Sequence, residues 1–572
     1  ADPVATAYVG ADSVLHIFRK HDGVGLAVAA TVSDADDAAS SLNIPAGARF
    51  IVRTDHQGNQ RRLEANNGAL TQPLAAMPVI LDGFDLPTLA VHAGLEIGTQ
   101  GAAPSPVITA VRGSDAAVLA LRAVNPLDVP VKGSVVVKLA SGAAFPVQTI
   151  ALDPGADTLI RLPLTMAAGG AVEGDGVAEL RWTAPVAVSC RKAFKLVVLD
   201  PKSLGNLLRN GDMETVAGGK PANWSGSAAS VELATLGQGP GFEGRAARFS
   251  GEKDANYQHL SQAVVPPAPG RAYLYTAWVW NADMQAGSNL SVDDKTFFIP
   301  SVFDAGNTTP FWRLMTHVRE TPETARQMGF TPVVKGKGWA MYDNIRATLY
   351  EGTPFAAEAR HAAHAATVDG DLGDWDFADP IPLLCDNQLT ATEGYAWTPA
   401  NLSGVARFAW DREALYFAAK VRDDRHVATT TGEDTLRGDS IVIALHPGNR
   451  VERADGQAFA WHLGAAAPGG GSGRHTLYRP PARSGGLASG QLAKDSSVYE
   501  VAILRAGDTT TYELRIPWAE TGGLTPALGV KAGLSLQLFD ADGAGAPAVM
   551  TWGGGLRPAW SPAGFGVLTL TE

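Results

Sequence analysis

The sequence predicts an all-β chain of four tandem β-sandwich or jelly-roll domains. Short apolar segments recur along the chain, for example at 13–20, 48–55 and 77–83, and turns rich in Asp, Gly and Asn separate them. The 63 Gly and 36 Pro residues are enough to end many short strands, whereas no helical pattern of ten or more residues alternates with the strands. A chain of 572 residues is also too long for one ordinary domain, so we expect several separate cores.

The composition excludes some classes of partner. The formal net charge is −12, and Lys and Arg form no cluster of the kind that phosphate binding needs, so we expect no nucleic-acid partner. No run of 18 apolar residues occurs, so we expect no membrane span. The only cysteines, Cys190 and Cys385, lie far apart and are not expected to pair; such low cysteine content suits a cytosolic protein or an exported bacterial one. The opening ADPVATAYVG is too polar for a signal peptide.

The strand pattern predicts one β-sandwich in residues 1–88 and a second in residues 89–204. The layout of the first segment resembles the small β-domain that accompanies the catalytic barrel of many glycoside hydrolases, and an unrelated sandwich is the alternative. The second segment has strands separated by an Asn125-Pro126 turn and a Pro-Gly turn. It resembles the immunoglobulin-like spacer domains of extracellular bacterial enzymes. No catalytic group stands out in the second segment.

Residues 205–351 carry a more specific pattern. They open with NLLRNGDMETVAGGKPANW and close with GWAMYDNIRATLYE, with a small-residue strand, a glutamine-containing strand and a Tyr-rich strand between. In this order the motifs resemble carbohydrate-binding modules of the family 4, 16 and 22 jelly-roll type. Met213 stands where those modules usually have Phe, a change that conserves volume. The resemblance implies a jelly roll that binds carbohydrate.

The same resemblance implies a structural calcium ion. Its side-chain ligands would be Glu214 and Asp343, with backbone carbonyls completing the oxygen shell that calcium prefers. The alternative is that both acids only cap turns.

The Tyr-rich strand supplies candidate sugar-binding residues. Alternation in YLYTAWVW puts Trp278 and Trp280 on one face of the strand. Two Trp side chains on one face form a flat apolar surface on which pyranose rings can stack. Further aromatic residues that could line the same groove are Tyr257, Trp312 and Trp339. The alternative is that the Trp face is buried against the second sheet or a neighbouring domain.

Residues 352–362 predict an Ala-rich linker. The neighbouring His361 and His364 have the i, i+3 spacing that a helix could use for a metal. Two His residues without a third ligand are weak evidence for a metal site, so we interpret the segment as a connector.

Residues 363–572 repeat the strand pattern with motifs of their own. They begin with TVDGDLGDW, continue through GDSIVIALHP and close with WSPAGFGVLTL, and this order resembles family 9 carbohydrate-binding modules. The resemblance implies that Trp375 packs over the sandwich at the domain entry, with the surrounding acids as turn formers. A calcium ion held by Asp369, Asp424 and Asp439 is the alternative role for these acids.

Family 9 modules hold a terminal sugar between two Trp residues. Trp560 matches one of these positions, whereas Leu436 stands where the other Trp is expected. Because half of the stacking pair is missing, we predict that the C-terminal domain contributes little to glycan affinity. We expect that affinity to reside in residues 205–351.

No catalytic residue is assigned. The alternation of strands and helices typical of a catalytic barrel is absent from the sequence, as are Gly-x-Ser-x-Gly, His-Glu-x-x-His and Walker motifs. Whether the chain is the C-terminal part of a glycoside hydrolase stays open. We predict a noncatalytic, multimodular region of an extracellular polysaccharide-degrading system, secreted or at the bacterial cell surface, with polysaccharide as its partner.

Two other functions remain. The first is a structural or cell-surface scaffold whose sandwiches act as spacers, and the second is a glycoside hydrolase with its site in the first sandwich. Exposed aromatic residues would favour glycan binding, whereas buried or replaced ones would favour the scaffold.

Overall fold

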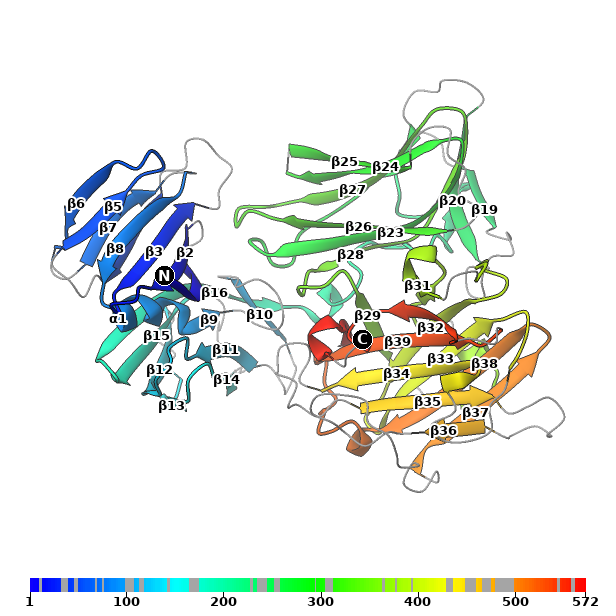
Figure 1. Cartoon of the computed structure of the whole chain (residues 1–572). Helices are drawn as coiled ribbons and strands as arrows, with labels where there is room; N and C mark the ends of the chain where they lie inside the picture. The colour runs from blue at the N-terminus through cyan, green and yellow to red at the C-terminus, as the bar shows by residue number, and fades with distance from the viewer. Residues whose placement is uncertain are drawn as a thin grey trace. The chain divides into compact units, whose positions relative to one another are not determined.

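The computed structural model divides the chain into two compact units, one within residues 1–198 and one within residues 199–572 (Figure 1). The structure describes all residues except 10–12, 32–39, 46–49, 67–68, 75–76, 98–106, 113–117, 141–144, 164–173, 227–229, 234–243, 252–257, 294, 304–311, 363–365, 376–377, 392–394, 428–435, 448–458, 466–474, 479–497, 543–545 and 557–560.

The first unit is built from antiparallel sheets. One has the order β1-β2-β3-β8-β5-β6, a second β10-β16-β15-β12-β13 and a third β14-β11-β9, while β4 pairs with β7. Its strands are β1 (Asp2–Val9), β2 (Ser13–Arg19), β3 (Gly25–Thr31), β4 (Ser40–Pro45), β5 (Phe50–Thr54), β6 (Gln60–Glu64), β7 (Ala69–Leu74), β8 (Val79–Phe84), β9 (Leu95–Ile97), β10 (Val107–Val111), β11 (Val118–Val124), β12 (Val131–Leu139), β13 (Gln148–Leu152), β14 (Asp157–Pro163), β15 (Gly174–Ala184) and β16 (Val188–Leu199).

One apolar core extends through the first unit. The short helices α1 (Leu86–Ala90) and η1 (Val91–Ala93) run across the boundary expected between residues 88 and 89. Asp85 caps α1 by accepting a hydrogen bond from the backbone N–H of Thr88 at 3.2 Å. Val91 of η1 packs in the same core as Leu15 and Trp182, which come from either side of that boundary. The two sandwiches expected here therefore share a core.

The second unit begins with two facing sheets. One has the order β19-β20-β28-β23-β26, and the other contains β21-β27-β24-β25 with β22 also paired to β27; Figure 1 shows β24, β25 and β27 in a layer apart from β23, β26 and β28. After η2 (Pro201–Ser203), the strands are β17 (Val216–Ala217), β18 (Lys220–Pro221), β19 (Ser230–Leu233), β20 (Arg245–Gly251), β21 (Gln258–His259), β22 (Gln262–Val264), β23 (Ala272–Ala282), β24 (Gln285–Val292), β25 (Lys295–Phe303), β26 (Arg313–Glu320), β27 (Met328–Lys335) and β28 (Gly338–Leu349).

The C-terminal half of the second unit is a larger sandwich. Its strands follow the order β36-β35-β34-β39-β41-β29-β32-β33-β38-β37, with β30 on β32 and with β40 joining β39 to β31. They are β29 (Ala356–His361), β30 (Ile381–Leu383), β31 (Leu389–Thr390), β32 (Ser403–Trp410), β33 (Ala414–Arg422), β34 (Ser440–His446), β35 (Phe459–Ala465), β36 (His475–Tyr478), β37 (Glu500–Ala506), β38 (Thr509–Pro517), β39 (Lys531–Asp540), β40 (Ala548–Trp552) and β41 (Gly566–Thr571), with single helical turns η3 (Leu372–Asp374), η4 (Asp386–Gln388), η8 (Trp518–Glu520) and η9 (Pro562–Gly564).

The all-β prediction is confirmed, but the connector expected at residues 352–362 is wrong in part. Residues 356–361 form β29, which pairs in parallel with both β41 and β32. The Ala-rich sequence suits this position because Ala357 and Ala359 pack in the core of the C-terminal sandwich. A short strand between two others needs small side chains more than it needs β-branched ones. The described helices contain none that is long and apolar enough to cross a membrane.

Strand β23 shows the predicted alternation and explains how the two halves of the second unit join. Tyr273 and Tyr275 point into the core between the first two sheets. Trp278 and Trp280 point the other way, into a second apolar cluster that includes Leu384 of the C-terminal sandwich. The Trp face is therefore covered by the neighbouring sandwich.

A buried ionic cluster lies at the same junction. Arg346 of β28 donates a hydrogen bond to Glu358 of β29, and its guanidinium nitrogen Nη1 lies 3.6 Å from Oδ2 of Asp379. Arg360 donates to both carboxylate oxygens of Asp379 at 3.1 and 3.2 Å. Burial raises the pKa of Glu358 to about 7, and the charge of Arg346 opposes that rise. Charge pairing thus accompanies apolar packing where the sandwiches meet.

The acidic entry of the C-terminal sandwich is structural, as the sequence predicted. Trp375 is buried, and its indole Nε1 donates to Oε1 of Glu513 at 2.8 Å. The other carboxylate oxygen of Glu513 accepts the backbone N–H groups of Asp369 and Gly370. The Asp369 side chain accepts from the backbone of Asp371 at 2.9 Å, which is a turn-forming contact.

This arrangement makes Glu513 a specific test of the fold. Glu513→Ala leaves one indole and two backbone donors without their acceptor, so we expect the free energy of unfolding to fall by about 3 kcal/mol or more. Glu500→Ala, an exposed carboxylate on the adjacent β37, should change it by no more than about 0.5 kcal/mol. Thermal and urea unfolding of the full chain measure the free energy of unfolding of both variants. Equal, small effects of the two substitutions would show that Glu513 does not hold the entry loop.

Candidate functional site

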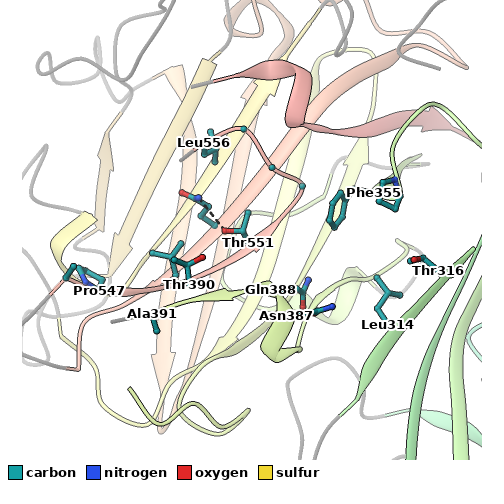
Figure 2. Close-up of a pocket in the computed structure, with 17 residues that line it drawn as sticks. Leu314, Thr316, Phe355, Asn387, Gln388, Thr390, Ala391, Pro547, Thr551 and Leu556 are labelled. Carbon is teal, nitrogen blue, oxygen red and sulfur yellow. Dashed lines mark hydrogen bonds between the residues drawn. The ribbon is translucent and has the colours of Figure 1, made fainter. Parts of the chain in front are cut away.

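A pocket of about 530 Å3 lies in the second unit where β26 approaches the C-terminal sandwich (Figure 2). Leu314 and Thr316 of β26 form one side of the pocket. Phe355, which directly precedes β29, and residues of the C-terminal sandwich form the remainder. A volume of this size is within the range of pockets that hold small ligands. The pocket therefore needs both halves of the unit.

The C-terminal sandwich supplies most of the lining. Asn387 and Gln388 come from η4 and Thr390 from β31, while Gln537 and Thr551 face each other across β39 and β40. Figure 2 shows Asn387, Gln388, Thr390 and Thr551 spread along the pocket. Gln537 Nε2 donates a hydrogen bond to Thr551 Oγ1 at 3.4 Å. The described lining residues include no charged side chain.

Gln388 holds the wall in place, and this occupies its amide group. Its Oε1 accepts the backbone N–H groups of Leu384 and Cys385 at 2.9 and 3.0 Å, and its Nε2 donates to the carbonyl of Pro382 at 3.1 Å. Asn387 beside it is exposed, and no hydrogen bond to its side chain is found within the described part of the chain. Asn387 is therefore the amide that a ligand can reach.

A glycine turn leaves one side of the pocket open. Gly553 and Gly555 have φ angles of 76° and 77°, which only glycine adopts without strain. A Cβ on Gly555 would lie 2.0 Å from the carbonyl oxygen of Ser561, so a side chain is excluded there on steric grounds as well. The turn therefore lines the pocket with backbone.

Among the residues that the structure describes, Phe355 is the aromatic side chain that lines the pocket. Its ring is partly exposed and packs edge-on against buried Trp552, with ring centroids 5.7 Å apart. This contact fixes the ring while leaving part of its surface toward the pocket, as Figure 2 shows. The sequence reasoning missed Phe355 because it lies in the segment interpreted as a linker.

One of the two family 9 positions expected to bind sugar, Leu436, lies beside residues that line the pocket. Leu436 packs with Val549 and Leu556, and both of these line the pocket. Trp560 lies outside the described residues, four positions beyond Leu556. The motif comparison therefore pointed to this edge of the sandwich, although it did not identify the pocket.

The aromatic residues expected on the jelly roll are not exposed as a platform. Trp278, Trp280 and Trp312 are 3%, 8% and 1% exposed, and a ring this buried cannot stack on a sugar in this arrangement. Trp339 is half-buried and packs edge-on against Trp280 with centroids 5.6 Å apart. Tyr257 lies outside the described residues. The expected surface is a packing interface because the C-terminal sandwich covers it.

The two acids expected to bind calcium lie within electrostatic reach of each other. Asp343 is 7% exposed and accepts the N–H of Asn344 at 2.7 Å. Burial raises its pKa well above the ordinary value, and the negative charges of Glu214 and Asp212 raise it further. Glu214 is exposed and accepts the N–H of Arg245 at 2.7 Å. A buried carboxylate beside two further acids fits a cation.

Comparison with known proteins gives one family match and several distant structural likenesses. A carbohydrate-binding module of family 9 from Caldicellulosiruptor kristjanssonii in complex with cellotriose is 17% identical, covers 38% of this chain and 94% of that one, and gives a TM-score of 0.27. A putative carbohydrate-binding protein from Bacteroides uniformis is 14% identical, with 38% and 99% of the chains covered and a TM-score of 0.25. The xylan-binding CBM22-1 domain of Paenibacillus barcinonensis Xyn10C is 13% identical, with 26% and 99% covered and a TM-score of 0.20.

These structural likenesses are too distant to carry an argument about this chain, and no curated protein matches it. The family match is different because it rests on a model of the sequence family. It spans the described sandwich from the Asp369 turn to the last strand, β41. Residues 368–572 match the family described as carbohydrate family 9 binding domain-like.

Proposed function

We propose that the chain binds a neutral glycan without acting on it, and that the glycan occupies the pocket between β26 and the C-terminal sandwich. The observation that carries this proposal is that the pocket lies on the sandwich that matches a carbohydrate-binding family. Leu436, which stands where that family has one of its Trp residues, packs against a cluster that contains the pocket residues Val549 and Leu556. The system in which the chain works is proposed to be extracellular and to degrade polysaccharide.

The chemistry of the lining supports a neutral sugar. Amide and hydroxyl groups on Asn387, Thr390 and Thr551 can hydrogen-bond to sugar hydroxyls, and partly exposed Phe355 offers a surface for a pyranose ring. No charged group in the described lining would balance the carboxylate of an acidic sugar. Small apolar residues such as Ala391 and Leu556 complete the walls.

A scaffold role is the second candidate, and one observation favours it. The paired Trp face of β23, which the glycan-binding hypothesis expected on the surface, is used to join two sandwiches. A spacer needs such joints but does not need a pocket. Binding measurements on the pocket therefore separate the two functions.

Filling the pocket should abolish glycan binding. Ala391 is exposed and lines the pocket, so Ala391→Trp places a large side chain in it, whereas Ala396→Trp adds the same ring on the same sandwich outside it. We expect the unmodified chain and Ala396→Trp to bind at least one sugar in calorimetric titrations with cellotriose, β-1,4-galactotriose and xylohexaose. Ala391→Trp should lose this binding. Retained binding in Ala391→Trp would place the glycan elsewhere.

Removing one polar contact should weaken binding by less. Asn387→Ala deletes the exposed amide, and the loss of one neutral hydrogen bond, about 1 kcal/mol, corresponds to roughly a fivefold rise in Kd. Asp386→Asn is the matched control, because Asp386 lies beside the pocket and pairs with Arg313 at 3.5 Å instead of lining it. Equal affinities of the two variants would argue against Asn387 as a contact.

We also propose that calcium binds at Glu214 and Asp343. These residues would hold the ion through carboxylate oxygens, and the ion would supply positive charge to a buried acid and stabilise the fold. Chelation should lower the melting temperature of the full chain, and calcium should restore it. Glu214→Gln should remove this dependence, while Glu323→Gln, an exposed carboxylate on the same module, should keep it. A melting curve that does not respond to chelator or calcium would contradict the site.

A further inference from the structure

A second group of acids lies at one end of the C-terminal sandwich and includes no residue that lines the pocket. Asp423 directly follows β33, Asp439 directly precedes β34, and Asp540 ends β39. One ligand atom each from Asp423, His426 and Asp439 lies within 4.8 Å of the others, and the same holds for Asp423, Asp540 and Asp542. Asp423 therefore belongs to two overlapping sets of potential metal ligands.

These carboxylates are buried with few cationic partners. Asp423, Asp439 and Asp540 are 3%, 6% and 1% exposed. Among the described residues, the ion pairs of the group are those of Arg505 with Asp423 at 3.2 Å and of His426 with Asp439 and Asp423. The negative charge of the group is thus incompletely balanced.

Hydrogen bonds fix the orientation of the acids but leave room for a ligand. Asp439 Oδ1 accepts the N–H of Ala541 at 2.9 Å, and Tyr395 donates to Asp540. Oδ1 of Asp542 is buried and has no hydrogen-bond partner among the described residues. An unsatisfied carboxylate oxygen inside a protein is costly unless a cation or donor meets it.

His426 is the independent observation that points to a metal. Its side chain is 5% exposed, and neither ring nitrogen has a hydrogen-bond partner within the described part of the chain. Nδ1 nevertheless lies 3.2 Å from Oδ2 of Asp439 and 3.8 Å from Oδ2 of Asp423. Separations of this size leave Nδ1 and the two carboxylate oxygens close enough to bind one cation between them.

We propose that Asp423, His426 and Asp439, together with Asp540 and Asp542, form a binding site for a divalent cation that accepts both carboxylate and imidazole ligands, the class that includes Mn2+ and Zn2+. Calcium prefers oxygen ligands alone, whereas imidazole suits transition metals and zinc. The ion would join the segment that follows β33 to the segment that follows β39. Asp540 pairs with Ala548, whose neighbours Pro547 and Val549 line the pocket, so the ion would also stabilise that wall.

Mn2+ binding to the full chain tests this proposal. After removal of metals, titration followed by electron paramagnetic resonance and calorimetry should show a site that is retained in Glu214→Gln, in which the proposed calcium site is lost. We expect His426→Gln and Asp542→Asn each to weaken Mn2+ binding at this site at least tenfold. Asp424→Asn should leave it unchanged, because Asp424 is an exposed neighbouring acid outside both ligand sets.

Two results would overturn the proposal. The first is Mn2+ binding that is absent or is the same in His426→Gln, Asp542→Asn and Asp424→Asn. The second is a site that prefers Ca2+ to Mn2+ and does not respond to His426→Gln, which would exclude the imidazole. Circular dichroism and melting curves of each metal-free variant check that it folds. If His426→Gln unfolds, Asp542→Asn still tests the site, because the Asp542 side chain is partly exposed and its loss breaks no ion pair among the described residues.

Discussion

The second unit depends on the burial of one strand face. Strand β23 sends its Tyr side chains into the jelly-roll core and its Trp side chains into the joint with the C-terminal sandwich. Burying an aromatic side chain stabilises a protein by about 2 kcal/mol, so several rings at one joint outweigh what an exposed sugar platform could contribute. The joint sets the distance between β26 and the sandwich, and the pocket exists because of that distance.

The ionic cluster at the joint adds specificity to this packing. Glu358 is buried, and Arg346 reaches it from the other half of the unit. Removing either partner would leave an uncompensated buried charge, which is strongly unfavourable. The two sandwiches are therefore expected to keep one relative arrangement, and a ligand held by both benefits from a preformed site.

Local patterns in the sequence predicted much of the fold. Alternation in YLYTAWVW gave the correct faces of β23, and the turn chemistry around Asp369 correctly predicted a structural entry loop for Trp375. Alternation does not reveal what covers a face, so the sequence left open whether the Trp pair binds sugar or is buried against a neighbouring domain, and the structure shows the burial. The Ala-rich strand β29 has no β-branched residue and was interpreted as a linker, which also concealed Phe355. A pocket lined from β26, η4 and β40 depends on long-range packing that sequence spacing cannot show.

The central claim is that glycan binds in the pocket at the joint. The most direct test is hydrogen–deuterium exchange of the full chain, measured with and without a saturating oligosaccharide. The oligosaccharide is the one that binds most tightly in the calorimetric titrations. The account predicts slower exchange in the η4–β31 segment, in β40 with the glycine turn, and in β26, with little change in residues 1–198. Protection confined to other strands, or no protection with any sugar, would contradict the account and favour the scaffold function.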